Sequence, residues 1–494
     1  MQTGFENMTK EELVQVATNL ESRLSLMQFE MDQLKRLIFG SKRERFISNE
    51  THGQMALPFD IPEPEHKQEE EPEQISYSRR KKNRDNHPGR MTLPDHLPVK
   101  ETVIEPDQDT TGMKCIGKEI TNQLEYEAAK FFIDRTIRPK YVKNDTETET
   151  STVVVAELPV FPIEKGLAGS GLLTQVLIDK YVDHLPIYRQ IERFKREGIK
   201  IASSTINGWQ ESLANLLEPL YDTMLKRVLS QGYLQVDETP TPVLDKNKKG
   251  KTHRGYYWVY HSPLDKTVVF DYREGRGREG PQKLLADFKG YLQTDGYQVY
   301  DSFGENKSIT LLNCMAHARR KFEKALDYNR PKAEYAMEMF QKIYDVERKA
   351  REQDLDPEQR YKLRLDESLP LLNELGKWII EIYKTELPKS PLAKACAYCI
   401  PRWDKLLAFL NDGSLEIDSN LVENAIRPVT LGRKNYLFAG STRGAQRAAM
   451  FYSFFGTCKK NKVNPFQWLK KVLQIIPEYK VNKLHELLPQ NLEL

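Results

Sequence analysis

Two stretches of the chain nearly repeat each other, Gly232-Tyr-Leu-Gln-Val-Asp237 and Gly290-Tyr-Leu-Gln-Thr-Asp295. Each is a short apolar run opened by glycine and closed by aspartate, which is typical of a buried strand that delivers a carboxylate to its end. Two such neighbouring strands form a natural site for a divalent metal, because hard cations take oxygen ligands. The alternative is that both aspartates start turns, as Asp-Glu-Thr-Pro and Asp-Gly commonly do.

The sequence between and after the repeats predicts an α/β sandwich. Residues 256–261 and 267–272 are β-rich runs separated by turn residues, and 281–288 has a helical pattern. A strand at 308–312 is expected to continue into a basic helix that contains His317. From about residue 321 to 410 the pattern is long-period and helical, which predicts a helical insertion.

Composition favours a soluble globular protein of several domains. The 494 residues leave room for roughly three or four domains of ordinary size. Hydrophobic residues make up 39% and charged residues 29%, and no apolar run approaches the length of a membrane span. The N-terminus lacks the features of a signal peptide, and five cysteines indicate a reducing compartment rather than a disulfide framework. We therefore expect a cytoplasmic protein with no membrane partner.

The net charge of +3 does not by itself indicate a nucleic-acid partner. The distribution is more informative, because residues 63–73 are acidic and residues 79–90 are strongly basic. The basic run is either a solvated segment or a nucleic-acid contact, and composition does not decide between them.

The N-terminus carries a heptad seam over about four heptads. Alternating steps of four and three residues connect apolar positions Leu13, Ala17, Leu20, Leu24, Met27, Met31, Leu34 and Ile38. We predict a coiled coil and hence self-association, the alternative being an amphipathic helix packed on the core. The N-terminal domains are then a coiled coil at 1–46, a flexible charged linker at 47–97 and a small β-containing module at 98–160.

Residues 161–229 form a helical block that resembles a helix-turn-helix DNA reader. Helices are predicted near Leu172 and from Pro186, and after a turn at Gly198 a capped helix should start at Ser203. The block is locally basic, and its candidate DNA contacts are Arg189, Arg193, Lys195 and Arg196. The alternative is a helical spacer without a DNA contact.

A third acidic residue lies beyond the predicted insertion, in the run from Asp418 to Pro428. The pattern predicts a capped helix ended by Pro428. Asn420, Glu423 and Arg427 share one face of that helix, so spacing alone also allows a plain surface ion pair between Glu423 and Arg427.

Several motifs, in conserved order along nearly the whole chain, resemble transposases of the insertion-sequence 66 family. They are Val-Asp237-Glu-Thr, Thr-Asp295-Gly-Tyr, Ala-His317-Ala-Arg-Arg-Lys-Phe, the stretch from Glu423-Asn-Ala-Ile-Arg-Pro to Leu-Phe438-Ala-Gly, Lys180-Tyr-Val-Asp-His-Leu-Pro-Ile-Tyr-Arg189 and the leucine-rich N-terminus ending Leu37-Ile-Phe-Gly40. The fold expected is multidomain α/β, with a ribonuclease H-like core interrupted by an all-helical insertion.

The resemblance implies a DDE enzyme whose catalytic and metal-binding residues are Asp237, Asp295 and Glu423. Two Mg²⁺ or Mn²⁺ ions are expected, with Asp237 bridging them, Asp295 on one and Glu423 on the other. Further candidate phosphate contacts are His317, Arg319, Arg320, Arg427, Arg433 and Lys434. The remaining domains expected are the core at 230–325 and 411–460, the insertion at 326–410 and a helical tail at 461–494.

The sequence departs from the family pattern at two places. The family usually has a cysteine-rich zinc module before the helical block, but only Cys115 lies there, so a four-ligand zinc site cannot be built. Cys396 and Cys399 have metal-like spacing, although a helical setting favours buried core cysteines, and zinc is not expected. Asn424 replaces the arginine that the family commonly has beside its glutamate.

The function expected is metal-dependent cleavage of DNA at the ends of an insertion sequence and transfer of the 3′-hydroxyl into target DNA. The alternatives are an inactive DNA-binding protein derived from a transposase and a ribonuclease H-like nuclease that only hydrolyses. The partners expected are the terminal inverted repeats, target DNA, further copies of the chain and accessory proteins of the same element, in the bacterial cytosol at the nucleoid.

Overall fold

The structure, a computed structural model, describes residues 131–132, 140–144, 151–155, 160–164, 166–245, 248 and 250–494. The predicted coiled coil, the linker and Cys115 therefore lie outside the described residues. Of the predicted β-containing module, the structure describes two strands, β1 (Lys140–Asn144) and β2 (Ser151–Val155), which pair antiparallel.

Among the described residues three helices precede the five-stranded sheet: α2 (Ser170–Tyr181), α3 (Ile187–Arg196) and α4 (Ser203–Leu229). Gly198 has φ +78 in the turn before α4, as only glycine does at little cost. The predicted side-chain cap at Ser203 is wrong, because Ala202 is the N-cap and offers no oxygen. The buried face of α4 contributes Leu213, Leu217, Leu220 and other residues to the same core as the sheet.

A five-stranded mixed sheet lies at the centre, with strand order β5-β4-β3-β6-β7. Its strands are β3 (Tyr233–Leu244), β4 (Thr252–Ser262), β5 (Thr267–Arg273), β6 (Gly290–Thr294) and β7 (Ile309–Asn313). The first three pair antiparallel, whereas β6 runs parallel to both β3 and β7. All of the strands predicted around the two repeats are present. Short helices α5 (Glu279–Leu284) and η2 (Gln298–Glu305) connect them.

The two sequence repeats are the neighbouring parallel strands β3 and β6. Their register pairs Tyr233 with Tyr291 and Gln235 with Gln293, so equivalent residues of the repeats lie side by side. Because side chains alternate along a strand, the tyrosine, glutamine and aspartate of each repeat share one face. That register brings the two closing aspartates to the same end of the sheet.

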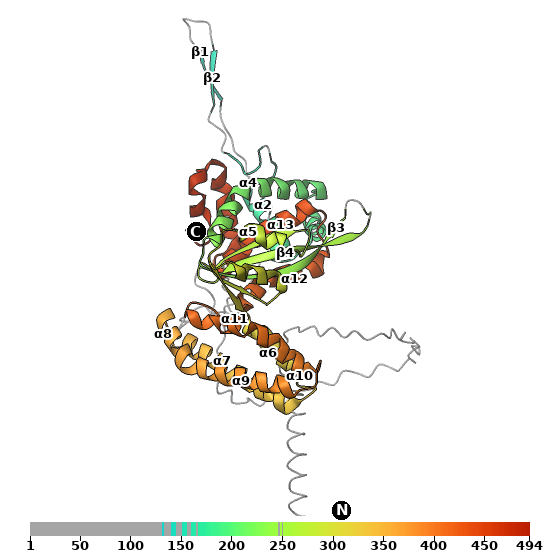
Figure 1. The fold of residues 1–494 in the computed structure, drawn as a ribbon. Coiled ribbons are helices and arrows are strands. Elements are labelled where there is room, and N and C mark those ends of the chain that lie inside the picture. Colours follow the sequence, from blue (N-terminus) through green and yellow to red (C-terminus); the bar gives the residue numbers. More distant parts are fainter. Residues whose placement is uncertain are drawn as a thin grey trace, which may run out of the picture. The chain divides into compact units, whose positions relative to one another are not determined.

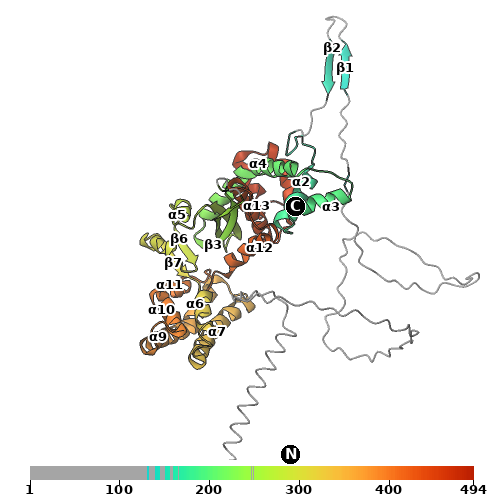
Figure 2. The same cartoon turned by 90° about the vertical axis from the view of Figure 1, so that its right-hand side faces the viewer.

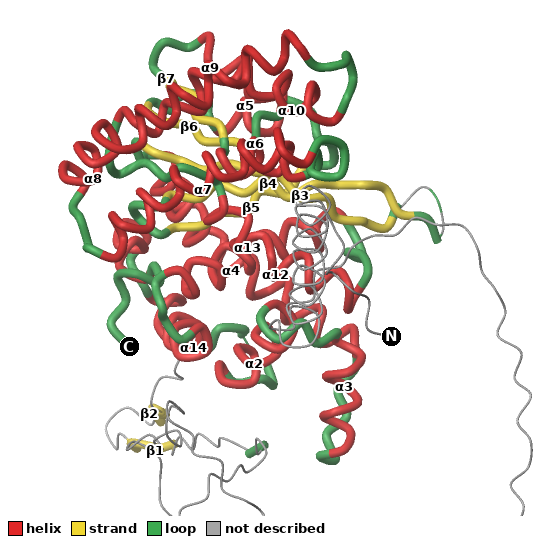
Figure 3. Tube along the Cα trace, turned by 90° about the horizontal axis from the view of Figure 1, so that it is seen from below, coloured by secondary structure: helices red, strands yellow, loops and turns green. Residues whose placement is uncertain are grey.

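The two faces of the sheet are covered by separate hydrophobic cores. Leu234 and Leu311 pack with α2, α4 and the C-terminal helices α13 (Thr442–Lys460) and α14 (Pro465–Ile475), whereas the adjacent Tyr233 and Leu312 pack with the helices that follow β7. Figure 3 shows the strands as a layer between these two groups of helices. In β3, β6 and β7 side-chain alternation thus divides the buried apolar residues between the two cores, whereas those of β4 and β5 belong to the first core alone.

The region between β7 and residue 411 is helical in every regular element, as the sequence predicts. After α6 (Met315–Glu323) the chain forms α7 (Arg330–Glu352), α8 (Pro357–Leu363), the π-helical turn η3 (Arg364–Ser368), α9 (Leu369–Thr385), α10 (Pro391–Cys399), η4 (Ile400–Arg402), α11 (Trp403–Leu407) and η5 (Ala408–Asn411). They gather beside the β6–β7 edge of the sheet (Figure 2).

Helix α12 (Asn420–Tyr436) brings the chain back to the sheet, and Pro428 lies inside it. The prediction that Pro428 ends this helix is therefore wrong. The residues after the proline are held by packing, because Val429 is buried in the core shared with the sheet and tertiary contacts can outweigh the local preference.

The chain ends in α13 (Thr442–Lys460), α14 (Pro465–Ile475), η6 (Ile476–Glu478) and η7 (Val481–Leu487). Helix α13 lies against the sheet (Figure 1), where Ser453 accepts from the Phe270 amide at 2.8 Å and Thr457 accepts from the Val268 amide at 3.0 Å. Among the described helices none is long and apolar enough to cross a membrane.

Candidate active site

Asp237 lies within the central strand β3, opposite Val259 of β4. The strand continues to Leu244, so the alternative that Asp237 starts a turn is wrong. Its carboxylate keeps some solvent access but is densely surrounded by protein. Burial raises its pKa to about 8, and the negative charges of Glu238, Asp295 and Glu423 act in the same direction. The site therefore collects negative charge around one carboxylate.

Asp295 follows the last residue of β6 and does begin a turn. Its Oδ1 accepts a hydrogen bond from the Tyr297 amide at 2.8 Å, and Gly296 has φ +87. The turn is fixed from the helical region, because Tyr398 donates its hydroxyl to the Asp295 carbonyl at 2.8 Å and Arg402 donates to the Gly296 carbonyl at 3.2 Å. The second aspartate is thus held by both the sheet and the insertion.

Glu423 lies in the first turn of α12. Arg320 of α6 donates to both carboxylate oxygens, at 3.1 and 3.0 Å, and His317 places Nδ1 3.8 Å from Oε1. His317 and Arg320 are three residues apart on α6 and so share a face. The alternative ion pair with Arg427 is not the one formed, since Arg427 is exposed and Arg320 is the partner of Glu423.

The structure thus brings Asp237, Asp295 and Glu423 together from a strand, a strand end and a helix. Asp295 and Glu423 both lie near enough to Asp237 for their charges to raise its pKa. His317 adjoins the same group, because the charges of Glu423 and Asp295 both act on it. Burial and the Arg320 charge nevertheless lower the His317 pKa, so its imidazole is neutral at pH 7.

Glu238 is a further charged neighbour that the sequence analysis did not single out. Its side chain is only 2% exposed, and it accepts from Arg276 at 2.6 Å and from the Tyr300 hydroxyl at 3.1 Å. Burial raises its pKa, and the Arg276 interaction opposes that rise. Its partners belong to its own side of the strand, but its charge still acts on Asp237. Glu238 could have been identified from the sequence because it adjoins Asp237, and a charge at that distance acts on Asp237 even when the two side chains point to opposite faces.

Cys314, His317 and Glu423 place ligand-type atoms within 4.8 Å of one another. Burial raises the Cys314 pKa to about 11, so this residue is a thiol at neutral pH. Its sulfur accepts a hydrogen bond from the Ser419 amide at 3.3 Å, at the N-terminus of α12. Cys314 is therefore occupied in holding α12.

The carboxylate set suits a hard divalent cation. Oxygen ligands are those that Mg²⁺ and Mn²⁺ prefer, and a cation would offset the charge repulsion that raises the Asp237 pKa. Arg320 now bonds both oxygens of Glu423, but 43% of its side chain is exposed. A long side chain with that exposure can move aside when the carboxylate takes a metal.

The predicted DNA-contact residues lie in three places. On α3, Arg193 is committed to the buried Asp179, Lys195 pairs with Glu192 at 2.6 Å, and Arg189 and Arg196 are exposed. On α6, Arg319 lies 3.7 Å from Glu323. On α12, Arg427 and Lys434 are exposed, and Arg433 donates to the Pro240 carbonyl. Only His317 and Arg320 of this set adjoin the three carboxylates.

Cys396 and Cys399 are both buried in α10, within the core of the helical region. Burial raises their pKa values to about 11 and about 12, so both are protonated thiols at neutral pH. Their packing among Leu392, Ala395 and Leu406 explains their spacing without a metal.

Comparison with known proteins gives matches over most of the chain. The family described as Transposase IS66 family matches residues 165–447, and the IS66 C-terminal element matches residues 453–490. A third family, described as Transposase C of IS166 homeodomain, matches residues 26–102, across the predicted coiled coil and linker.

Three proteins of Sinorhizobium fredii are similar in sequence. The uncharacterized protein y4jD is 32% identical over 420 residues, which cover 81% of each chain. The uncharacterized protein y4qI is 34% identical over 417 residues, covering 80% of this chain and 76% of its own, and y4hP is 31% identical over 431 residues, covering 81% and 76%.

Proposed function

The chain belongs to the IS66 family of transposases, and from that premise we propose that it cuts DNA at the ends of an insertion sequence and joins the freed 3′-hydroxyl to target DNA. The observation that carries this proposal is the convergence of Asp237, Asp295 and Glu423 from β3, the end of β6 and α12.

The sheet supports a ribonuclease H-like core for this reaction. Three antiparallel strands continue into two parallel ones, and the central strand carries the first carboxylate. The second carboxylate follows the adjacent parallel strand, and the third arrives on a helix after the sheet is complete. Carboxylates placed in this way on rigid elements can hold a reacting phosphate group in a fixed geometry.

Asp237, Asp295 and Glu423 would hold two Mg²⁺ ions, which supply charge stabilisation to the attacking and leaving oxygens of a phosphodiester. Residues of the chain itself would contribute proton loss and phosphate binding at this site. As a ligand Asp237 would be ionised, and its pKa near 8 makes the loss of that proton easy at neutral to mildly alkaline pH. Arg320, released from Glu423, is placed to contact a DNA phosphate beside the site.

Neither reaction step requires a covalent enzyme intermediate. Water attacks the phosphodiester at the element end in the first step, and the bond to the 3′-oxygen breaks to free a 3′-hydroxyl. That hydroxyl attacks a phosphodiester of target DNA in the second step, and the target's own 3′-oxygen leaves. The number of phosphodiester bonds is unchanged by the second step, so no energy source is needed.

DNA is the partner that the family and its homeodomain-like element support. We include the terminal inverted repeats and target DNA in the proposal, together with self-association through the N-terminal segment. From membership of the family we also propose that accessory proteins of the same element take part and that the protein associates with the nucleoid.

A nicking assay with labelled DNA carrying the element's inverted repeats tests the proposal. Wild type should nick the end with Mg²⁺ and not with EDTA, and Asp237→Asn should slow nicking by about a hundredfold or more, because metal assistance contributes several kcal/mol. Asp271→Asn is the matched control, since Asp271 is a partly buried aspartate of the same sheet, paired with Arg273 at 2.6 Å on β5. It should nick like wild type.

The same assay separates the alternatives. Binding to the ends without nicking, unchanged by EDTA or by Asp237→Asn, contradicts catalysis and identifies a DNA-binding relative. Nicking without any joined product, when target DNA and a pre-cut end with a free 3′-hydroxyl are supplied, identifies a nuclease that only hydrolyses.

A further inference from the structure

The glutamines of the two sequence repeats are fully buried and bonded to each other. Gln235 donates to Gln293 Oε1 at 2.8 Å, and Tyr233 donates its hydroxyl to the same oxygen at 2.5 Å. All three side chains are at most 1% exposed. Polar groups buried this deeply are almost always hydrogen-bonded. The other hydrogen-bond partners of these three side chains therefore indicate which part of the fold they hold in place.

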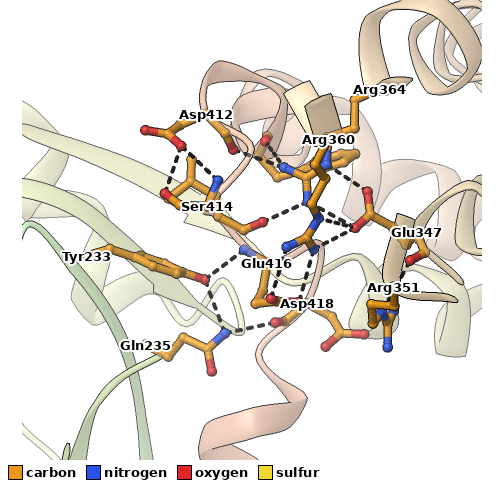
Figure 4. Close-up of polar contacts among 12 residues, drawn as sticks. Tyr233, Gln235, Glu347, Arg351, Arg360, Arg364, Asp412, Ser414, Glu416 and Asp418 are labelled. Carbon is orange, nitrogen blue, oxygen red and sulfur yellow. Dashed lines mark hydrogen bonds and ion pairs between the residues drawn. The ribbon is translucent and has the colours of Figure 1, made fainter. Parts of the chain in front are cut away.

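Apart from a bond of 3.2 Å that Gln235 donates to the Tyr233 hydroxyl, the remaining bonds of the three side chains go to the segment that leads into α12 and to the first turn of that helix. Gln293 donates to the Glu416 carbonyl at 2.8 Å, and Tyr233 accepts from the Glu416 amide at 3.1 Å. Gln235 donates to the Asp418 carbonyl at 2.9 Å. Figure 4 shows Tyr233 and Gln235 on one side of this segment, with Glu416 and Asp418 facing them.

Gln235 also caps the helix that carries the third carboxylate. Its Oε1 accepts from the Val422 amide at 3.2 Å, in the first turn of α12. Amides in a first turn lack full intrahelical partners and usually bond to the N-cap side chain, but the N-cap Ser419 makes no such bond here. A side chain from β3 therefore adds a capping bond in this turn, one residue before Glu423, beside the bond that Asp418 Oδ1 accepts from the Asn420 amide at 3.0 Å.

The opposite side of the segment is held by the helical region. Arg360 bonds Glu416 at 3.3 Å and Glu347 at 2.6 Å, and Arg364 donates to the Leu415 carbonyl at 2.7 Å. Tyr344 of α7 donates its hydroxyl to Asp418 at 2.9 Å. Figure 4 shows Glu347, Arg360 and Arg364 on this side of the segment. The segment is therefore fixed from both sides and has little freedom to shift.

We propose that Tyr233, Gln235 and Gln293 act as a clamp that positions Glu423 relative to Asp237 and Asp295. Gln235 and Gln293 each lie two residues before an aspartate of the site, on the same face of the same strand. The clamp thus relates all three carboxylates through one hydrogen-bonded unit, although Glu423 is distant in sequence. These are positioning residues, and the inference rests on the proposed metal-dependent function.

Direct Mn²⁺ binding to the purified full chain, measured by titration calorimetry, tests the clamp. Gln235→Met keeps the side-chain length but removes every hydrogen bond, and it should weaken Mn²⁺ binding about ten- to a hundredfold, as loss of a residue that orients a ligand does. Combining it with Glu423→Gln should weaken binding no further than Glu423→Gln alone, because both changes remove the same interaction.

Thr457→Val is the matched control. It too removes a fully buried hydrogen-bonding group beside the sheet, where Thr457 accepts from the Val268 amide at 3.0 Å on β5. It should lower the melting temperature but leave Mn²⁺ affinity unchanged. In the nicking assay Gln235→Met should lower the turnover rate and leave the affinity for end DNA unchanged, a separation that general destabilisation does not produce.

The outcomes are distinct. Wild-type Mn²⁺ affinity in Gln235→Met, with weakened binding in Glu423→Gln, overturns the clamp and leaves the proposed function intact. Unchanged binding in both Glu423→Gln and Asp237→Asn overturns the metal site and the clamp with it. If Gln235→Met does not fold, Tyr233→Phe decides: it removes one hydroxyl, and unchanged Mn²⁺ affinity in this variant also overturns the clamp.

Discussion

Gly290 occupies a backbone conformation that its equivalent in the first repeat does not need. Its φ is +126, and a Cβ there would overlap the carbonyl group of Gly232. Gly290→Ala should therefore destabilise the protein by about 2 kcal/mol or more, from backbone strain and from separation of β3 and β6. Gly232→Ala is the control, since no atom lies within 4 Å of its Cβ position, and its cost should be near that of a surface substitution. Chemical denaturation measures both, and equal costs would contradict the register of the two repeats.

The buried imidazole of His261 makes the free energy of unfolding depend on pH. Burial lowers its pKa to about 3, and the charge of Lys460 acts in the same direction. The unfolded chain therefore binds more protons than the folded one between pH 6.5 and 3, so stability falls as pH falls through that window. The loss from this residue should be roughly 2–3 kcal/mol between pH 7 and 4.5.

Replacing the imidazole by an amide isolates that contribution. His261→Gln should make the free energy of unfolding fall less between pH 7 and pH 4.5, whatever its constant effect on stability. His485 is exposed, so His485→Gln should leave the pH dependence as in wild type. An unaltered dependence in His261→Gln would show that the buried imidazole can be protonated in place.

The residues of the candidate site were predictable to different degrees. The strand pattern made Asp237 and Asp295 candidates for a metal pair, with turn starts as the alternative, because alternation and a closing carboxylate are local features. Family resemblance then favoured the metal pair. Glu423 came from family resemblance, since its approach to the sheet depends on contacts across the whole helical region. Glu238 and the Arg320 partner of Glu423 were missed because neither follows from spacing within one element.

At the scale of elements, the π-helical turn η3 carries a fully buried cation, Arg364. It bonds Glu347 at 2.7 Å and the carbonyls of Phe409, Asp412 and Leu415 at 2.9, 2.9 and 2.7 Å. Arg364→Met should destabilise the protein by about 3–5 kcal/mol, because it leaves a buried carboxylate with one partner fewer and three carbonyls unsatisfied.

The exposed pair between Lys349 and Glu367 provides the comparison for Arg364. Both of its side chains are about two-fifths exposed, so Lys349→Met should change stability by less than about 0.5 kcal/mol. Urea titration of the two variants checks the contrast. Similar small effects would mean that the helical region is not held together through Arg364.

Element boundaries were predicted less well wherever proline was involved. Pro240 and Pro242 lie in β3 beyond the last residue that pairs with β6. On that side the strand forms an isolated bridge between Val243 and Ala439, in which Pro242 supplies its carbonyl and needs no amide, so proline is tolerated. Pro428 lies inside α12, where packing of Val429 continues the helix. In both places the local proline signal was outweighed by an arrangement that only the tertiary fold determines.

At the scale of the whole molecule, the sheet separates two cores, and strand alternation was sufficient to predict an α/β arrangement. The sequence did not show that α4 shares a core with the sheet, because its apolar face looks the same in a free-standing helical block. The predicted coiled coil, the linker and Cys115 lie outside the described residues, so the predictions that depend on them stay predictions.

DNA binding by a chain with a net charge of only +3 must depend on local basic surfaces. Helix α3 presents Arg189, Lys195 and Arg196 to solvent. If all three contact phosphates, replacing them together by glutamine should reduce the slope of log Kobs against log salt by about 2 to 3, since each contact contributes about 0.9. Fluorescence anisotropy with end DNA over a salt series measures the slope.

Arg193 distinguishes a DNA-binding face from a basic helix that serves only the fold. It lies on the same helix but pairs with Asp179, whose side chain is 3% exposed. Arg193→Gln should therefore lower the free energy of unfolding, because it leaves a buried carboxylate without its cation, and keep the salt slope of wild type. If the triple variant also keeps the wild-type slope, α3 is a structural helix and the phosphate contacts lie elsewhere. If Arg193→Gln alone reduces the slope, the guanidinium leaves Asp179 when DNA binds, and the pairing seen here belongs to the free protein.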